Sequence, residues 1–324
     1  MGASDHSAGP ASVPTAAPSA PYVFGLDGGG TSSRLRIADR SNAVVLELAG
    51  EGVNPNAVDR ETLALRLEGL FRGVRDNLGP AGLFAAGCAA VAGMEREPEQ
   101  GEFERILRDR LGFTCPLVLV SDPIAALVGG LESPEGMILI AGTGSIALAR
   151  LSDGRRFRAG GYGHYLSDEG SAFFIGFQAL RRGIRSGEGR DLPTAFLEDL
   201  LAFYGLSAAQ DAIAFVYSRF DKAAIAKAAT LIAGYRDRGD ELAIDIYREA
   251  VTELVALAAS AAAAAGPALA HRDLLLWGGL FEHDPWLAEE VVRELGKILP
   301  VFTVRRALHD AAYGACMLAL EKVR

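Results

Sequence analysis

The stretch at residues 22–39, YVFGLDGGGTSSRLRIAD, decides the fold. A short apolar run ends in Asp27, three glycines follow, and apolar and charged residues then alternate from Ser32 onward. The alternation predicts a second strand, so the glycines form the turn of a β-hairpin. Glycine in such a turn allows positive φ angles and lets backbone N–H groups approach phosphate oxygens. The alternative is an ordinary hairpin that binds nothing.

Two common phosphate-binding motifs are excluded at this turn. A dinucleotide-binding fingerprint requires its glycines to lead into a helix, whereas a strand follows here. A P-loop requires the pattern G-x-x-x-x-G-K-[ST], which does not occur in the chain.

The order of predicted elements indicates an α/β protein in which one opening occurs twice. Residues 136–151, GMILIAGTGSIALARL, repeat the series of strand, glycine turn and strand. This repeat predicts that the chain forms two related α/β halves with a cleft between them. Further strands are expected at 43–50, 83–93, 116–122, 155–161, 273–279 and 301–307, and helices at 57–78, 98–111, 240–265, 286–296 and the C-terminus.

Composition excludes several classes of protein. Half of the 324 residues are hydrophobic and the formal net charge is -9, which argues against a nucleic-acid partner and gives no support for an anionic membrane. No apolar run is expected to reach transmembrane length. Cys88, Cys115 and Cys316 are far apart, so we expect reduced thiols in a cytoplasmic protein. Residues 1–20 are rich in Ala, Pro and Ser and predict a disordered tail.

Two later glycine turns strengthen the phosphate interpretation. LIAGTGS (139–145) again runs from an apolar strand into glycine and hydroxyl residues, so two turns could hold a polyphosphate from both halves. LLLWGGL (274–280) ends a late buried strand and could let adenine or ribose lie against the backbone. Its alternative is close packing between helix and strand.

These motifs resemble those of a known superfamily. GLDGGGTSSRLRIAD, IAGTGS and LWGG stand in the order of the phosphate-1, phosphate-2 and adenosine motifs of the actin–hexokinase–Hsp70 superfamily. More narrowly, SDPIAALVGG, ILIAGTGSIA and AGGYGHYLSDEGSAFFIG resemble the N-acetylglucosamine kinase and BadF/BadG/BcrA/BcrD ATPase family. The resemblance runs from about residue 22 to the C-terminus, and residues 160–176 are its most specific part.

The resemblance implies an α/β fold of two RNase H-like lobes, the actin-like ATPase fold, with a cleft between the lobes. The N-terminal lobe would comprise residues 21–122 and be joined by the C-terminal helix at about 309–324. The larger C-terminal lobe would comprise residues 123–308 and carry helical insertions.

The resemblance also implies an ATP and Mg²⁺ site. Asp27 would contact Mg²⁺ through water, since Mg²⁺ keeps several waters and takes few carboxylates. The alternative is a turn aspartate that bonds its own backbone. The implied ATP-binding residues are Gly28, Gly29, Gly30, Thr31, Gly142, Thr143, Gly144, Gly278, Gly279 and Glu282.

A phosphoryl transfer to a sugar also needs a carboxylate near the acceptor hydroxyl. The resemblance places Asp122 on the catalytic base, although Asp before Pro is also a common helix cap. Asp168 would bind the sugar; Ser167 or Asp168 could instead be only a cap. The implied substrate-binding residues are Asn54, Asp122, Ser145, Gly161, Tyr162, Gly163 and Asp168.

Some residues depart from the family pattern and put the sugar in doubt. Ile146 replaces a polar Asn of the animal enzymes, Tyr162 a common Trp and Ser167 a common Gly. Glu95 could reach the cleft or lie in a solvated loop, and His164 is expected to be structural.

We expect an ATP-dependent amino-sugar kinase that makes the 6-phosphate of N-acetylglucosamine or glucosamine. Its partner would be a small-molecule amino sugar, with no nucleic acid and no membrane, and a homodimer is possible. The alternatives are a dehydratase-activating ATPase of the same family, which needs cysteine ligands for an Fe–S cluster, and a sugar or nucleotide sensor without catalysis.

Overall fold

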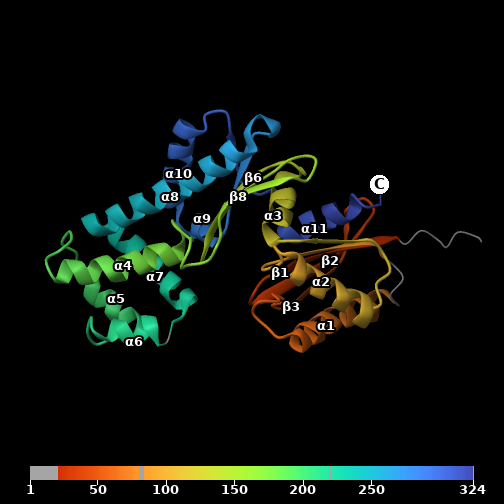
Figure 1. Ribbon diagram of the computed structural model, residues 1–324, viewed down its shortest axis with the longest axis horizontal. Helices are drawn as coiled ribbons and strands as arrows, with labels where there is room; N and C mark the ends of the chain where they lie inside the picture. The colour runs from red at the N-terminus through yellow and green to blue at the C-terminus, as the bar shows by residue number, and fades with distance from the viewer. Residues whose placement is uncertain (1–20, 80–83, 219, 324) are drawn as a thin grey trace, which may run out of the picture.

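The computed structural model describes residues 21–79, 84–218 and 220–323 (Figure 1). The predicted tail at residues 1–20 lies outside this range. The described chain forms two lobes, each built on a five-stranded sheet.

The sheet of the smaller lobe has the order β3-β2-β1-β4-β5. Strands β3, β2 and β1 are antiparallel, and β4 and β5 run parallel to β1. The predicted meander of three strands is therefore confirmed. The strands are β1 (Tyr22–Gly28), β2 (Ser32–Asp39), β3 (Val44–Glu51), β4 (Phe84–Val91) and β5 (Leu117–Val120).

The sheet of the larger lobe repeats this topology. Its order is β10-β9-β6-β7-β8, with β6, β7 and β8 antiparallel and β9 and β10 parallel to β6. Read from β8, the sequence order is the same as in the first sheet, so the predicted internal repeat is confirmed. The strands are β6 (Gly136–Ala141), β7 (Ser145–Arg150), β8 (Arg156–Gly160), β9 (Asp273–Trp277) and β10 (Thr303–Arg305).

A series of helices between β8 and β9 makes the second lobe larger. Two further helices, α9 and α10, follow β9. Asp221 and Asp240 cap α7 and α8 through their carboxylates, as the sequence pattern of Asp before a helix favours. The helices are α4 (Ala172–Gly187), α5 (Leu197–Phe203), α6 (Asp211–Tyr217), α7 (Lys222–Asp237), α8 (Glu241–Ala265), α9 (Gly279–His283) and α10 (Pro285–Ile298).

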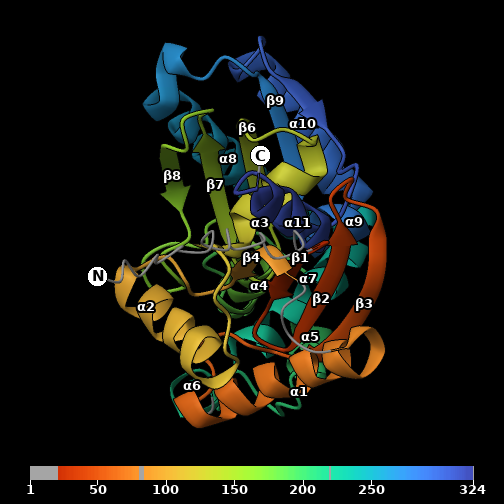
Figure 2. The same ribbon diagram turned by 90° about the vertical axis from the view of Figure 1, so that its right-hand side faces the viewer.

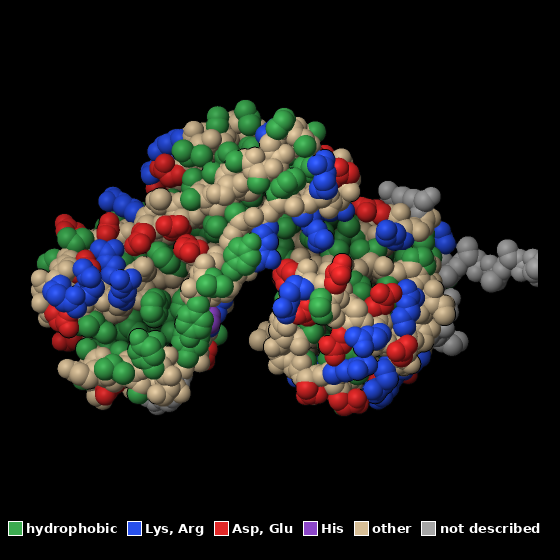
Figure 3. Space-filling model, viewed as in Figure 1, with side chains coloured by type: hydrophobic (Ala, Val, Ile, Leu, Met, Phe, Trp, Pro, Cys, Tyr) green, Lys and Arg blue, Asp and Glu red, His purple; other side chains and the backbone are tan. Residues whose placement is uncertain are grey.

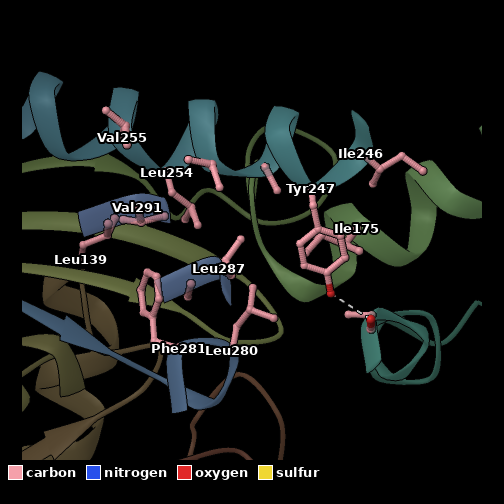
Figure 4. Close-up of a cluster of buried hydrophobic side chains, with 14 of the residues drawn as sticks. Leu139, Ile175, Ile246, Tyr247, Leu254, Val255, Leu280, Phe281, Leu287 and Val291 are labelled. Carbon is pink, nitrogen blue, oxygen red and sulfur yellow. Dashed lines mark hydrogen bonds between the residues drawn. The ribbon is translucent and has the colours of Figure 1, made fainter. Parts of the chain in front are cut away.

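The core of the larger lobe lies between α8 and the sheet (Figure 4). Leu139 of β6 points into it, whereas its neighbour Ile138 points to the opposite face, as the two-residue period of a strand requires. Tyr247 of α8 is buried there, and its hydroxyl donates a 2.9 Å hydrogen bond to the carbonyl of Ala229 in α7. This bond fixes α7 against the core.

Two helices pack between the sheets: α3 (Asp122–Leu131) and α11 (Ala311–Leu320) (Figure 2). They share one hydrophobic cluster with Val23 of the first sheet and Leu275 of the second. The two helices cross at Gly129 and Gly314, where a Cβ on Gly129 would lie 2.9 Å from the Gly314 nitrogen. The other face of the first sheet is covered by α1 (Arg60–Leu78) and α2 (Glu97–Arg105).

Three expectations about elements need correction. The helix predicted at 98–111 ends as α-helix at Arg105 and continues as a π-helical turn, Ile106–Arg110. The helix predicted from residue 57 begins at Arg60, because Asp59 caps it. Among the described residues, the segment Glu241–Ala268 is long and apolar enough to cross a membrane by length and composition, contrary to expectation. Its buried face packs on the sheet, as a core helix does.

Candidate active site

Two carboxylates lie at the carboxyl ends of parallel strands of the first sheet. Figure 3 shows a hollow between the two lobes. Asp27 is the last residue but one of β1, and Asp122 follows β5 after Ser121. Because β1, β4 and β5 are parallel, their carboxyl ends meet at one edge, which is where ligands bind in open α/β sheets. Glu95, on the exposed loop after β4, is close enough to act on Asp122.

The surroundings of these carboxylates disfavour their negative charges. Burial raises the pKa of Asp27 to about 6. The negative charge of Asp310 raises this pKa further, whereas the positive charge of Arg34 lowers it. Burial, followed by the charges of Asp27 and Glu95, raises the pKa of Asp122 to about 7. These residues therefore form an acidic cluster at this end of the first sheet, and a bound cation would stabilise their negative charges.

These residues could serve a hard cation such as Mg²⁺. Carboxylate oxygens are the ligands it prefers, and the mutual repulsion of Asp27 and Asp122 would be relieved by a divalent charge. Within the described ranges, no group of three or more His, Cys, Asp or Glu side chains could enclose a metal ion. A cation here would thus need water or phosphate oxygens as further ligands.

The structure overturns the helix-cap and turn alternatives for the three aspartates. Asp27 lies within β1 and not in a turn. Ser121 occupies the cap position of α3, so Asp122 is its first helical residue. Ser171 caps α4 by accepting from the nitrogen of Phe174, which leaves Asp168 outside the helix.

The first glycine turn is shaped by close packing. None of Gly28, Gly29 and Gly30 has a positive φ, so that part of the expectation is wrong. A Cβ on Gly28 would lie 2.5 Å from a methyl of Val53, which is why only glycine fits there. The Gly29 carbonyl accepts from the nitrogen of Val53 at 3.1 Å. Thr31 and Gly30 are exposed at the tip.

The second and third turns border a cavity of about 320 Å³ between α7 and α9. Gly142, Thr143 and Gly279 line it together with residues of α7, including Lys227. The structure thus brings predicted nucleotide residues from two turns to one cavity. Gly278 has a φ of 106°, and a Cβ there would lie 2.5 Å from the carbonyl oxygen of Ala141.

A second cavity, of about 680 Å³, lies on the other side of α9 against α10 and β10. Gly278 and Glu282 line it, and neither Gly142 nor Thr143 does. Glu282 is therefore not brought to the same cavity as the phosphate turn.

The segment from β8 to α4 carries the predicted sugar residues and has an unusual backbone. Gly160, Gly161, Gly163 and Gly170 all have positive φ, and so does Asp168 at 70°. A left-handed aspartate is uncommon and often marks a functional position. The predicted sugar residues Gly161, Tyr162, Gly163 and Asp168 lie on this one segment.

Asp168 is buried and held by two groups. One carboxylate oxygen accepts from the nitrogen of Ser145 at 3.2 Å, and the other lies 2.7 Å from the Lys222 ammonium. The Ser145 hydroxyl donates to the carbonyl of Glu169 at 2.6 Å, so this hydroxyl braces the segment. Our sequence reasoning missed Lys222, and no local pattern singles it out.

Asn54 follows β3 in the smaller lobe, whereas Tyr162 follows β8 in the larger lobe. The side-chain oxygen of Asn54 accepts from the nitrogen of Asn56 at 2.8 Å, and a Cβ on Gly93 would lie 2.6 Å from it. Tyr162 is exposed, and the Arg158 guanidinium lies 4.3 Å over its ring.

Comparison with known proteins agrees with this architecture. The family model described as the BadF/BadG/BcrA/BcrD ATPase family matches residues 24–319. The chain belongs to this family. It is 30% identical to the N-acetylmuramic acid/N-acetylglucosamine kinase of Clostridium acetobutylicum, over 92% of this chain and 98% of that one.

Two further similarities support the same fold and class. An N-acetyl-D-glucosamine kinase of Dictyostelium discoideum is 24% identical over 92% of this chain and 97% of that one. A solved structure from Chromobacterium violaceum, named as a candidate N-acetylglucosamine kinase, has a TM-score of 0.73 at 25% identity and covers 93% of this chain and 99% of that one. The predicted two-lobed fold and the class of ATP-dependent sugar kinase are confirmed.

Proposed function

We propose that this family member transfers the γ-phosphoryl group of ATP to the 6-hydroxyl of N-acetylglucosamine or glucosamine. The observation that supports it most is the pair of Asp27 and Asp122 at the sheet edge facing the cleft, with raised pKa values. The names of the curated relatives support an amino sugar as acceptor.

In the proposed reaction, Asp122 accepts the proton of the acceptor hydroxyl. The hydroxyl oxygen then forms a bond to the γ-phosphorus, the bond from that phosphorus to the β-γ bridging oxygen breaks, and ADP leaves. A pKa near 7 suits a base that must be ionised at neutral pH and still accept a proton. Asp168 and Asn54 would orient the sugar.

Asp27 would hold Mg²⁺, in part through water. When bound, Mg²⁺ neutralises charge on the phosphates as the bond breaks. The backbone groups of Gly28–Thr31 and of Gly142–Gly144 would bind phosphate oxygens from opposite lobes. We also propose the lobe boundaries 21–122 and 123–308, a homodimer and a cytoplasmic location.

The test is an ADP-release assay over a panel of sugars with the wild type and with Asp122→Asn. We expect N-acetylglucosamine or glucosamine to stimulate ADP release, and the Asn variant to lose about 10²–10⁴-fold in kcat, as removal of a general base does. The position of the new phosphate is read by NMR of the product. Absence of sugar-stimulated release, or an Asn variant as active as the wild type, contradicts the proposal.

The dehydratase-activating alternative is disfavoured by the thiols. Cys88 and Cys316 are buried and Cys115 is half-buried, with burial raising the pKa of each thiol. A cluster shared by two subunits needs thiolates that reach the surface. The sensor alternative predicts sugar binding without ADP release, so the same panel decides it.

A further inference from the structure

Lys222 places a positive charge against the second glycine turn. It is the first residue of α7, and its side chain is half-buried. Its ammonium lies 2.7 Å from an oxygen of Asp168 and 3.1 Å from the position that a Cβ on Gly144 would occupy. The ammonium is therefore beside both the expected phosphate turn and the expected sugar ligand.

The segment around Lys222 is held firmly against the sugar loop. Phe220 stacks on His164, with ring centroids 4.5 Å apart. Asp221 accepts hydrogen bonds from Ala223 and Ala224 and so fixes the start of α7. The backbone is thus fixed, while the four-carbon stem of the lysine can still redirect the ammonium.

The charges around the cleft explain why a cation is needed here. Asp27, Asp122 and Glu95 already make the opposite wall acidic. The triphosphate of ATP adds several negative charges, and its terminal phosphoryl group must lie between the two lobes. Among the ion pairs of the described residues, the charge of Lys222 is balanced by the buried Asp168 alone.

We propose that Lys222 binds the γ-phosphoryl group of ATP, and that it leaves Asp168 to do so. The exchange frees a buried carboxylate beside Ser145, and sugar hydroxyls then donate to it. This inference rests on the proposed function for the identity of the sugar, but not for the contact with the nucleotide. ATP and sugar then bind with positive coupling, because ATP takes Lys222 and the sugar takes Asp168 from the same ion pair.

A fixed structural brace is the competing interpretation. A brace keeps Lys222 on Asp168 in every state, so its removal weakens all ligands alike and lowers stability. An exchanging lysine instead distinguishes nucleotides by their γ-phosphoryl group.

The first experiment measures binding of ADP and of AMPPNP by calorimetry, with Mg²⁺ and without sugar. We expect Lys222→Met to weaken AMPPNP about 10–100-fold and ADP less than about 3-fold, since hydrogen bonds to charged groups contribute that much. Lys297→Met is the matched control, because Lys297 pairs with Glu294 at 2.8 Å on the exposed face of α10 and its loss should leave both affinities unchanged. Equal losses for the two nucleotides, or no loss, overturn the proposal.

The second experiment measures the coupling between ligands. In the wild type, AMPPNP should tighten N-acetylglucosamine by at least about 5-fold, and ADP should do so less. In Lys222→Met, the factor by which AMPPNP tightens sugar binding should fall to about 1, whatever the absolute affinity for the sugar. An unchanged factor would contradict the proposed movement of Lys222 from Asp168 to the γ-phosphoryl group.

The two proposals fail separately. If the wild type binds none of the sugars in the panel, the proposed function fails, while the comparison of ADP with AMPPNP still decides the role of Lys222. Thermal unfolding of the variant shows whether it is folded, and Lys222→Arg, which keeps the charge, should retain a preference for AMPPNP.

Discussion

Asp122 is a carboxylate whose charge is disfavoured by its surroundings, and as the proposed base it would set the pH dependence of activity. With a pKa of about 7 it is protonated below neutral pH, and Asp27 follows at about 6. We expect kcat/KM, measured at low concentrations of both substrates, to rise with pH up to about 7 and then level off. A limb centred near pH 4 contradicts the assignment.

The same raised pKa makes Asp122 a source of instability. A carboxyl group whose folded-state pKa exceeds its unfolded value binds its proton more tightly when folded, so stability falls as pH rises from about 4 to 7. Asp122→Asn should therefore stabilise the protein at pH 8 by about 1–2 kcal/mol, after allowing for partial exposure, and by little at pH 4. Urea unfolding at the two pH values measures this difference in the free energy of unfolding. A variant less stable than the wild type at pH 8 would contradict the raised pKa of Asp122.

At the residue scale, the sequence predicts kinds of side chain better than their partners. Asp27 and Asp122 can be singled out because each stands at the end of an apolar run, and the family resemblance implies their roles. The pairing of Asp168 with Lys222 cannot, because 54 residues and the helices α4 to α6 separate them. Gly28 was expected to supply a positive φ, yet its role is to make room for Val53, which lies two residues after the end of β3.

At the scale of elements, the crossing of α3 and α11 gives a matched pair of glycine variants. A Cβ on Gly129 would lie 2.3 Å from the Asp310 carbonyl oxygen, so Gly129→Ala should separate the helices and destabilise the protein by about 1–3 kcal/mol. Gly69 lies in α1 with nothing within 4 Å of the same atom, so Gly69→Ala should stabilise it by about 0.5–1 kcal/mol. The urea concentrations at the midpoint of unfolding compare the stabilities of the two variants. Equal effects would mean that helix propensity, and not the close crossing of α3 and α11, determines the change in stability.

The strands were predicted more reliably than the helix ends. Apolar runs followed by glycine turns predicted the first strand of both sheets. Both faces of β6 are apolar because each packs into a different cluster, as Leu139 and Ile138 show. Helix ends depend on local competition. Because Asp59 is the cap of α1, this helix begins at Arg60 and not at residue 57. At the end of α2, a π-helical turn replaces the last α-helical turn that was expected. No periodicity signals such a turn.

At the scale of the whole molecule, the expected ligands are divided between the lobes. Gly28–Thr31, Asp27 and Asp122 belong to the first sheet and α3, whereas Thr143, Asp168 and Lys222 belong to the larger lobe. Figure 3 shows the hollow between them open to solvent. We therefore expect the lobes to approach each other when a phosphoryl group contacts both sets, which would also keep water from the reacting atoms.

We therefore expect the radius of gyration, measured by small-angle X-ray scattering, to fall when AMPPNP, Mg²⁺ and N-acetylglucosamine are all saturating. Either ligand alone should give a smaller change, because each contacts fewer of the residues that lie on opposite lobes. Asp122→Asn, which removes a charge and leaves the α3 and α11 crossing intact, should still close. Since α3 and α11 pack against both sheets, they are the elements about which the lobes would turn. A radius unchanged by ligands that calorimetry shows to be bound would mean that the open form is the reactive one, and the division of the site between lobes would then have no catalytic meaning.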